Sequence, residues 1–137
     1  MKTGKEWTEE WFDRVWNHKD TDFIHDHLSP ECVIAGLGVP ARGPDGFLLF
    51  HQSMFEIFDD LRIEVTEQAE EGELVVGNAR IIALHKASEK QVDFEFGYSV
   101  RWVDGVIQTA HNIVDYLSMC TQAGILEEDF LSRSLMA

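Results

Sequence analysis

Apolar residues in the first sixty positions recur at helical spacing, with polar residues between them. A first helix is predicted over Trp7 to His18, beginning near Thr8. A second, over Asp22 to Leu28, ends at Ser29-Pro30, because proline disfavours helix in the residue before it. A third is predicted over Gly46 to Phe58, with Asp45 as its N-cap or first-turn acid. The third helix carries one broad apolar stripe, formed by Phe47, Leu48, His51, Met54, Phe55 and Phe58.

From position 61 onward the pattern changes to alternation, which is typical of half-buried strands. Strands are predicted over 61–66, over 74–87, and on both sides of a turn in the segment 92–117, with a further short strand over 31–37. A partly helical tail follows over 125–135. Helices followed by a run of strands predict an α+β domain. We expect a curved antiparallel sheet of four to six strands, wrapped around the third helix, with a blind pocket on its concave face.

The hairpin within 92–117 admits two registers. A three-residue loop at Val103-Asp104-Gly105, with a bulge, pairs Tyr98 with Ala110 and Phe96 with Asn112. A two-residue turn at Asp104-Gly105 would instead pair Tyr98 with His111. The first register is favoured. It places one set of side chains on the pocket face, namely Phe94, Phe96, Tyr98, Val100, Gln108, Ala110, Asn112 and Val114. The other set is then outer: Glu95, Ser99, Arg101, Ile107, Thr109, His111, Ile113 and Asp115.

Composition and charge narrow the function classes. The 137 residues fit a single domain over 1–137, and 45% are hydrophobic. A net charge of −14 opposes binding to nucleic acid and to anionic membranes. No apolar run is long enough for a membrane span or a signal core, so a cytoplasmic location is expected. Cys32 and Cys120 are predicted to be reduced and buried. No ligand spacing indicates a metal, and no phosphate loop or nucleophile elbow occurs, so no cofactor is expected.

Several strings, in order along most of the chain, resemble the SnoaL-like polyketide cyclases of the nuclear transport factor two-like superfamily. These strings are VWNHKDTDFIHDHLSP, the Gly43-rich lead into the third helix, MFEIFDDLRIEV, ALHKAS, RWVDGVI and IVDYLSMCTQAGIL. The resemblance implies a cone-shaped α+β barrel and an intramolecular aldol reaction. It also implies an Asp acid/base, with a His two residues before it, on the strand after the Asp-Gly turn. In the favoured register these positions are Asn112 and Ala110, and Asn112 cannot take up a proton at neutral pH.

His51, His85 and Asn112 are the candidate catalytic residues. Either histidine could act as the base, with Asn112 and Tyr98 as oxyanion donors. Each histidine has a structural alternative, namely a buried His51 bonded to backbone and a His85 bonded at the sheet rim. Asp115 and His111 are interpreted as outer-face residues, and Asn17 as a helix cap. The expected pocket lining is Trp16, Phe55, Phe58, Phe96, Tyr98 and Ala110.

Three hypotheses follow for the function. The first is a cofactor-independent cyclase or isomerase that acts on an apolar carbonyl or polycyclic substrate. The second is a non-catalytic protein that binds an apolar small molecule. The third is an interaction module that forms a homodimer through the outer sheet face at Ile107, Thr109, Ile113 and Ile81. Dimer formation is compatible with either of the other two.

Overall fold

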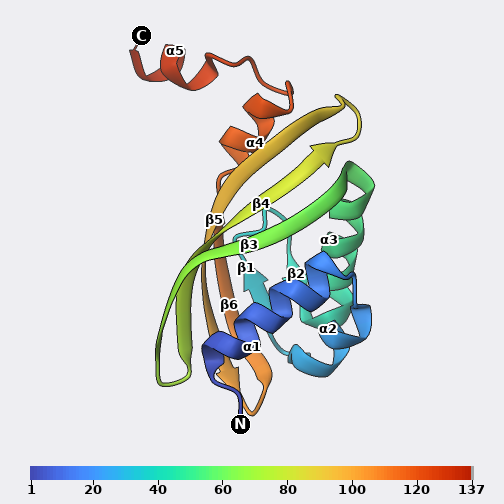
Figure 1. Ribbon diagram of the computed structural model, residues 1–137, viewed down its shortest axis with the longest axis vertical. Helices are drawn as coiled ribbons and strands as arrows, with labels where there is room; N and C mark the ends of the chain where they lie inside the picture. Colours follow the sequence, from blue (N-terminus) through green and yellow to red (C-terminus); the bar gives the residue numbers. More distant parts are fainter. Residues whose placement is uncertain (137) are drawn as a thin grey trace.

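The computed structural model describes residues 1–136, which form a curved, unclosed sheet of six strands together with helices (Figure 1). The strand order is β2-β1-β6-β5-β4-β3, and every neighbouring pair is antiparallel except β1 with β6. The predicted α+β class is thereby confirmed. The strands are β1 (Val33–Ala35), β2 (Ala41–Arg42), β3 (Phe58–Glu71), β4 (Leu74–His85), β5 (Lys90–Val103) and β6 (Val106–Val114). The helices are α1 (Gly4–Trp11), η1 (Phe12–Asn17), α2 (Thr21–His27), α3 (Gly43–Ile57), α4 (Tyr116–Gln122) and α5 (Phe130–Met136).

The first helix begins earlier than expected and widens at its end. The Thr3 side chain accepts a hydrogen bond from the Glu6 N–H at 3.2 Å, so the chain is helical from Gly4 rather than from near Thr8. From Phe12 to Asn17 the helix is a π-helix, η1, whose hydrogen bonds span one residue more than in an α-helix. The Asn17 side chain holds this wide turn against β3. Its oxygen accepts from the Ile63 N–H at 2.8 Å, and its amide donates to the Ile63 carbonyl at 3.3 Å.

Helix α3 begins before the predicted start at Gly46 and ends before the predicted end at Phe58. It begins at Gly43, and Pro44 suits the first turn because proline lacks a backbone N–H and no intrahelical hydrogen bond needs one there. Asp45 is therefore a first-turn acid and not the N-cap, a position that Arg42 occupies. Phe58 lies on β3 rather than on the helix. Strand β3 then runs to Glu71, well past the predicted end at 66, with register shifts that break the simple alternation.

The favoured register of the β5–β6 hairpin is wrong, and the alternative is correct only at its two-residue turn, where Trp102 pairs with Ile107. Asp104 and Gly105, with φ of 51° and 74°, form a two-residue turn between the paired Val103 and Val106. A bulge then shifts the register between Arg101 and Trp102, so that Tyr98 pairs with Asn112. The side chains that face inward from β6 beyond the bulge still include Ala110, Asn112 and Val114.

Because of the bulge, side chains at the start of β6 point to the face of the sheet opposite to the predicted one. Ile107 was expected on the outer face, but it is buried and lines the interior. Ile81 on β4 is also buried and inward-facing. Of the four residues predicted for an outer apolar face, Ile113 and Thr109 are exposed. The outer face is therefore less apolar than the sequence indicated.

After β6 the chain forms α4, which was not predicted, and then the short α5. The Asp115 side chain caps α4 by accepting a hydrogen bond from the Ser118 N–H at 3.0 Å. Helix α5 buries no side chain and extends away from the rest of the molecule (Figure 1). Within residues 1–136, no helix is both long and apolar enough to cross a membrane.

Gly36 is expected to be the glycine least tolerant of substitution, because a Cβ there would lie 1.6 Å from the Asn112 carbonyl oxygen. Its φ of 85° adds the cost of a left-handed conformation, about 1–2 kcal/mol. Gly36→Ala should therefore lower the free energy of unfolding, measured with urea, by clearly more than 2 kcal/mol, since β1 and β6 must separate. Gly72→Ala is the matched control: φ is 59° and nothing lies within 4 Å of the added Cβ. Equal losses in both variants would contradict the expected clash.

Candidate functional site

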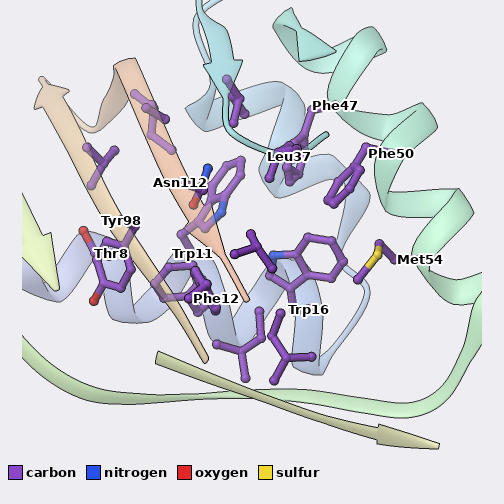
Figure 2. Close-up of a pocket in the computed structure, with 18 of the residues that line it drawn as sticks. Thr8, Trp11, Phe12, Trp16, Leu37, Phe47, Phe50, Met54, Tyr98 and Asn112 are labelled. Atoms are coloured by element: carbon purple, nitrogen blue, oxygen red, sulfur yellow. The ribbon is translucent and has the colours of Figure 1, made fainter. Parts of the chain in front are cut away.

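A deep cavity lies between the concave face of the sheet and the helices, and Figure 2 shows 18 of its lining residues. Its volume is about 80 Å³, room for a few water molecules or a short segment of a ligand. The helices contribute Thr8, Trp11, Phe12, Trp16, Phe47, Phe50 and Met54. The strands and loops contribute Ile34, Leu37, Leu61, Ile63, Ile81, Phe96, Tyr98, Ser99, Val100, Trp102, Ile107, Ala110, Asn112 and Val114, and helix α4 adds Tyr116.

A larger apolar groove adjoins the cavity. It offers about 740 Å³ of open space beside α3 and α4. Four residues, Leu37, Phe50, Met54 and Tyr116, line both the groove and the cavity, so the two spaces are neighbours. The rest of the groove lining is Gly38, Val39, Pro40, Gly46, Leu49, Ser53, Ile57, Phe58, His85, Met119 and Ile125. Val39, Leu49, Ile57 and Ile125 are exposed apolar side chains. The groove is therefore an apolar surface that adjoins the cavity.

The cavity lining contains no carboxylate, histidine, lysine or arginine among residues 1–136. The protein's large negative charge is thus kept away from its interior. In the same part of the chain, no group of three or more His, Cys, Asp or Glu side chains is placed to hold a metal ion. The hydrogen-bonding groups of the cavity are hydroxyls, one amide and indole N–H groups.

His51, a predicted catalytic residue, lies behind the cavity wall. It is 3% exposed, and its Nε2 lies 2.8 Å from the Val15 carbonyl, to which it donates. Its ring packs 4.9 Å from Trp16 and 4.8 Å from Phe55. Burial lowers the pKa of His51 below its ordinary value of 6.5, against the opposing effect of the bond to Val15, so the ring is neutral at pH 7. The contacts fit the structural alternative for this residue.

His85 lies in the wall of the groove and not in the deep cavity. Its Nδ1 is 2.8 Å from the Ser88 hydroxyl and accepts from the Ser88 N–H at 3.4 Å. Because an N–H can only donate, Nδ1 is an acceptor and the ring hydrogen lies on Nε2. The ring also packs against Phe58, 5.7 Å away. His85 is therefore the candidate histidine that a molecule in the groove can reach.

The two phenols of the cavity have already used their hydrogens within the protein. Tyr98 donates to the Gln68 Oε1 at 3.0 Å, and Tyr116 donates to the Leu37 carbonyl at 2.5 Å. Asn112 places its amide nitrogen 3.4 Å from the Ala35 carbonyl. Burial raises the pKa of Tyr98, helped by the nearby Glu9 carboxylate, and burial also raises that of Tyr116. Both phenols therefore stay protonated at neutral pH.

The predicted lining residues separate into two groups. Trp16, Phe96, Tyr98, Ala110 and Asn112 line the deep cavity. Phe58 lines the groove, and Phe55 packs against His51 and Trp16 instead, with Lys19 over its ring.

Sequence reasoning missed several lining residues, above all Trp11, Trp102 and Tyr116. Trp11 stands in the first apolar stripe, but a regular α-helix would not turn it to the same side as Trp16. Tyr116 belongs to the unpredicted α4. The cap pattern Asp115 to Ser118 is the signal that could have located that helix.

A family model described as SnoaL-like polyketide cyclase matches residues 7–123. The chain belongs to the SnoaL-like polyketide cyclase family. The inward-facing residues of β6 beyond the bulge are Ala110, Asn112 and Val114. None of them can take up a proton at neutral pH. No curated protein matches this sequence.

Solved structures of the same fold support the architecture of this SnoaL-like protein. IdmH from Streptomyces antibioticus is 20% identical, with a TM-score of 0.81 over 90% of this chain and 99% of its own. A SnoaL-like protein from Jannaschia sp. CCS1 is 21% identical, with a TM-score of 0.77 over 90% and 92%. A protein with a ketosteroid isomerase-like fold from Catenulispora acidiphila, in complex with trimethylamine, is 13% identical, with a TM-score of 0.79 over 89% and 95%. At these identities the likeness is one of fold.

The buried His51 should make stability sensitive to mild acid. Its pKa in the folded state is below the ordinary 6.5, so the unfolded chain binds more protons there. Its contribution is thus complete above about pH 6.5 and is lost as pH falls from that value towards the lower folded pKa. His51→Gln should show a shallower loss of unfolding free energy between pH 7 and pH 5 than the unchanged protein. The exposed His25→Gln is the control, and equal slopes for all three proteins would contradict this role of His51.

Proposed function

We propose that this SnoaL-like protein binds a neutral, apolar small molecule, with the body of the ligand in the groove and a narrow end in the deep cavity. The observation that carries the proposal is the uncharged, largely aromatic lining of the cavity. Burying an unpaired ionised group in such a space is costly, so charged ligands are disfavoured. Apolar walls with a few polar groups are typical of small-molecule sites.

The dimensions support a ligand that spans both spaces. About 80 Å³ in the cavity is too little for a polycyclic molecule, whereas the adjoining groove is about nine times larger. The ring of Phe50 and the side chain of Met54 line both spaces. The ligand therefore passes these two residues on its way inward.

Simple binding is favoured over the usual family chemistry. An aldol ring closure needs a group that removes a proton from carbon. Among residues 1–136 the cavity lining holds no such group, because Asn112 cannot act as a base and the phenols of Tyr98 and Tyr116 stay protonated. This makes the interior a binding surface.

A second candidate function is cofactor-independent isomerase or cyclase-type chemistry in the groove. The position of His85 in the groove wall favours it. This histidine lines the groove and directs its proton-bearing Nε2 away from the Ser88 contact. Its Nε2–H could donate a hydrogen bond to a carbonyl oxygen of a molecule in the groove and stabilise negative charge that develops there. For this function His85→Ala must abolish turnover of a compound that the variant still binds. Unchanged turnover would eliminate it.

Binding should depend on ligand charge and on free space in the cavity. We expect 2-acetylnaphthalene to quench tryptophan fluorescence and raise the melting temperature, and 2-naphthoate, with the same rings, to do neither. Ala110→Leu, which fills the inner wall, should weaken binding at least tenfold, about 1.4 kcal/mol. Thr109→Leu changes the exposed neighbour on the same strand and is the control. Equal binding of both compounds, or equal binding by both variants, would contradict the proposal.

We also propose a cytoplasmic homodimer that associates through the outer sheet face. Ile113, 74% exposed, and Val76 lie there around a hollow that includes Gly97. Light scattering should give twice the mass of one chain, and Ile113→Lys should give the mass of one chain. Leu131→Lys, on the exposed tail, is the matched control and should remain dimeric. A monomeric unchanged protein would refute this assembly.

A further inference from the structure

Two tryptophans of the cavity have indole N–H groups without a hydrogen-bond partner in residues 1–136. Trp11 and Trp16 are each 6% exposed and line the cavity, and neither indole nitrogen bonds to any residue in 1–136. In contrast, Trp102 in the same lining donates to the Thr8 hydroxyl at 2.8 Å. Every fully enclosed side-chain nitrogen or oxygen in the described chain has a partner, so these two nitrogens have open space beside them. Figure 2 shows both turned towards the middle of the cavity.

The π-helix explains how both tryptophans reach one side. Residues five apart on a regular α-helix diverge by about 140°, because each residue turns the chain about 100°. Between Trp11 and Trp16 the chain passes through η1, whose wider turn takes in one more residue. The two indoles are thereby brought to the same wall. π-turns of this kind occur frequently at functional sites.

Trp16 is held in this position from behind. His51 donates to the carbonyl of Val15, the residue before Trp16, at 2.8 Å. The rings of His51 and Phe55 lie 4.9 Å and 5.9 Å from that of Trp16. His51 is therefore a positioning residue for this indole. A donor whose direction is set before binding loses little freedom when a ligand arrives.

Tyr98, Tyr116 and Asn112, in contrast, direct hydrogens to acceptors within the protein. The Gln68 amide nitrogen donates to the Glu9 carboxylate at 3.0 Å, which fixes its oxygen towards Tyr98. Carbonyl oxygens, which can only accept, take the Tyr116 hydrogen and face the Asn112 amide nitrogen. Tyr98 and Tyr116 therefore retain acceptor capacity alone, whereas Asn112 keeps a second amide hydrogen. Among the aromatic side chains of the cavity, the donors still free to meet a ligand are the indoles of Trp11 and Trp16.

We infer that Trp11 and Trp16 determine ligand specificity, and that the narrow end of the ligand carries a neutral hydrogen-bond-accepting oxygen, such as a carbonyl. This inference rests on the proposed binding function and adds the chemical class of the ligand. The oxygen occupies the inner cavity, where it accepts from the two indole N–H groups, and the apolar remainder lies towards Phe50 and the groove. One such bond of ordinary net strength raises affinity about two- to tenfold.

The test compares cyclopentanone with methylenecyclopentane, which has the same shape but a CH₂ group in place of the oxygen. Indole N–H resonances of the ¹⁵N-labelled protein are assigned with single Trp→Phe variants and followed by NMR during titration. With cyclopentanone, the Trp11 and Trp16 protons should move downfield to saturation, and the Trp102 proton, already bonded to Thr8, should not. Methylenecyclopentane should shift methyl resonances of the cavity without moving either indole proton downfield.

The variants provide a second readout. Trp11→Phe and Trp16→Phe should each weaken cyclopentanone binding about fivefold and leave methylenecyclopentane binding within twofold, whereas Trp7→Phe, outside the cavity, should change neither. If both compounds bind equally and no indole proton moves downfield, this inference is overturned while the binding function stands. If neither compound shifts any cavity methyl resonance, the binding function falls and the inference with it.

Discussion

The wide turn of η1 is the constraint on which the interior depends. A curved sheet leaves a concave face that side chains must fill, and here one helix turn supplies three large aromatic rings, those of Trp11, Phe12 and Trp16. The turn is secured at both flanks, by the Asn17 amide on the backbone of Ile63 and by His51 on the Val15 carbonyl. The His51 bond pairs the Val15 carbonyl of the π-turn, and the Asn17 side chain pairs both backbone groups of Ile63 on β3. Packing and hydrogen bonding thus support the same irregular geometry.

Charge is separated sharply between surface and interior. The chain carries a net charge of −14, yet the cavity lining of the described residues holds no ionised group. The acidic side chains keep the surface hydrated, while the aromatic interior excludes charged molecules. The neutral ligand that we propose is compatible with both properties. The same separation removes the general base that proton transfer within the cavity would need.

Membership of the SnoaL-like family determines the walls of the site but not its chemistry. A shared fold supports many functions, because function depends on the side chains placed within it. On the inner wall, β6 presents Ala110, Asn112 and Val114. The register of the hairpin moves by two residues from the favoured prediction, and all three inward positions are still unable to ionise at neutral pH. The loss of an inner acid/base group therefore holds in both the favoured and the observed register, because a shift of two residues keeps the same side chains inward.

The sequence by itself determined the α+β class, the order of the three N-terminal helices and the long strands, and the inward-facing set Phe96, Tyr98, Ala110 and Asn112. Periodicity reports which face of an element is buried. The tertiary structure decided the rest. The bulge that turns Ile107 inward depends on pairing with β5, and the π-turn that aligns Trp11 with Trp16 depends on Asn17 reaching β3 and His51 reaching Val15. Partners up to 46 residues away make these contacts. The local sequence pattern does not indicate such distant hydrogen bonds. The polar character of the cavity could therefore be described only from the folded chain.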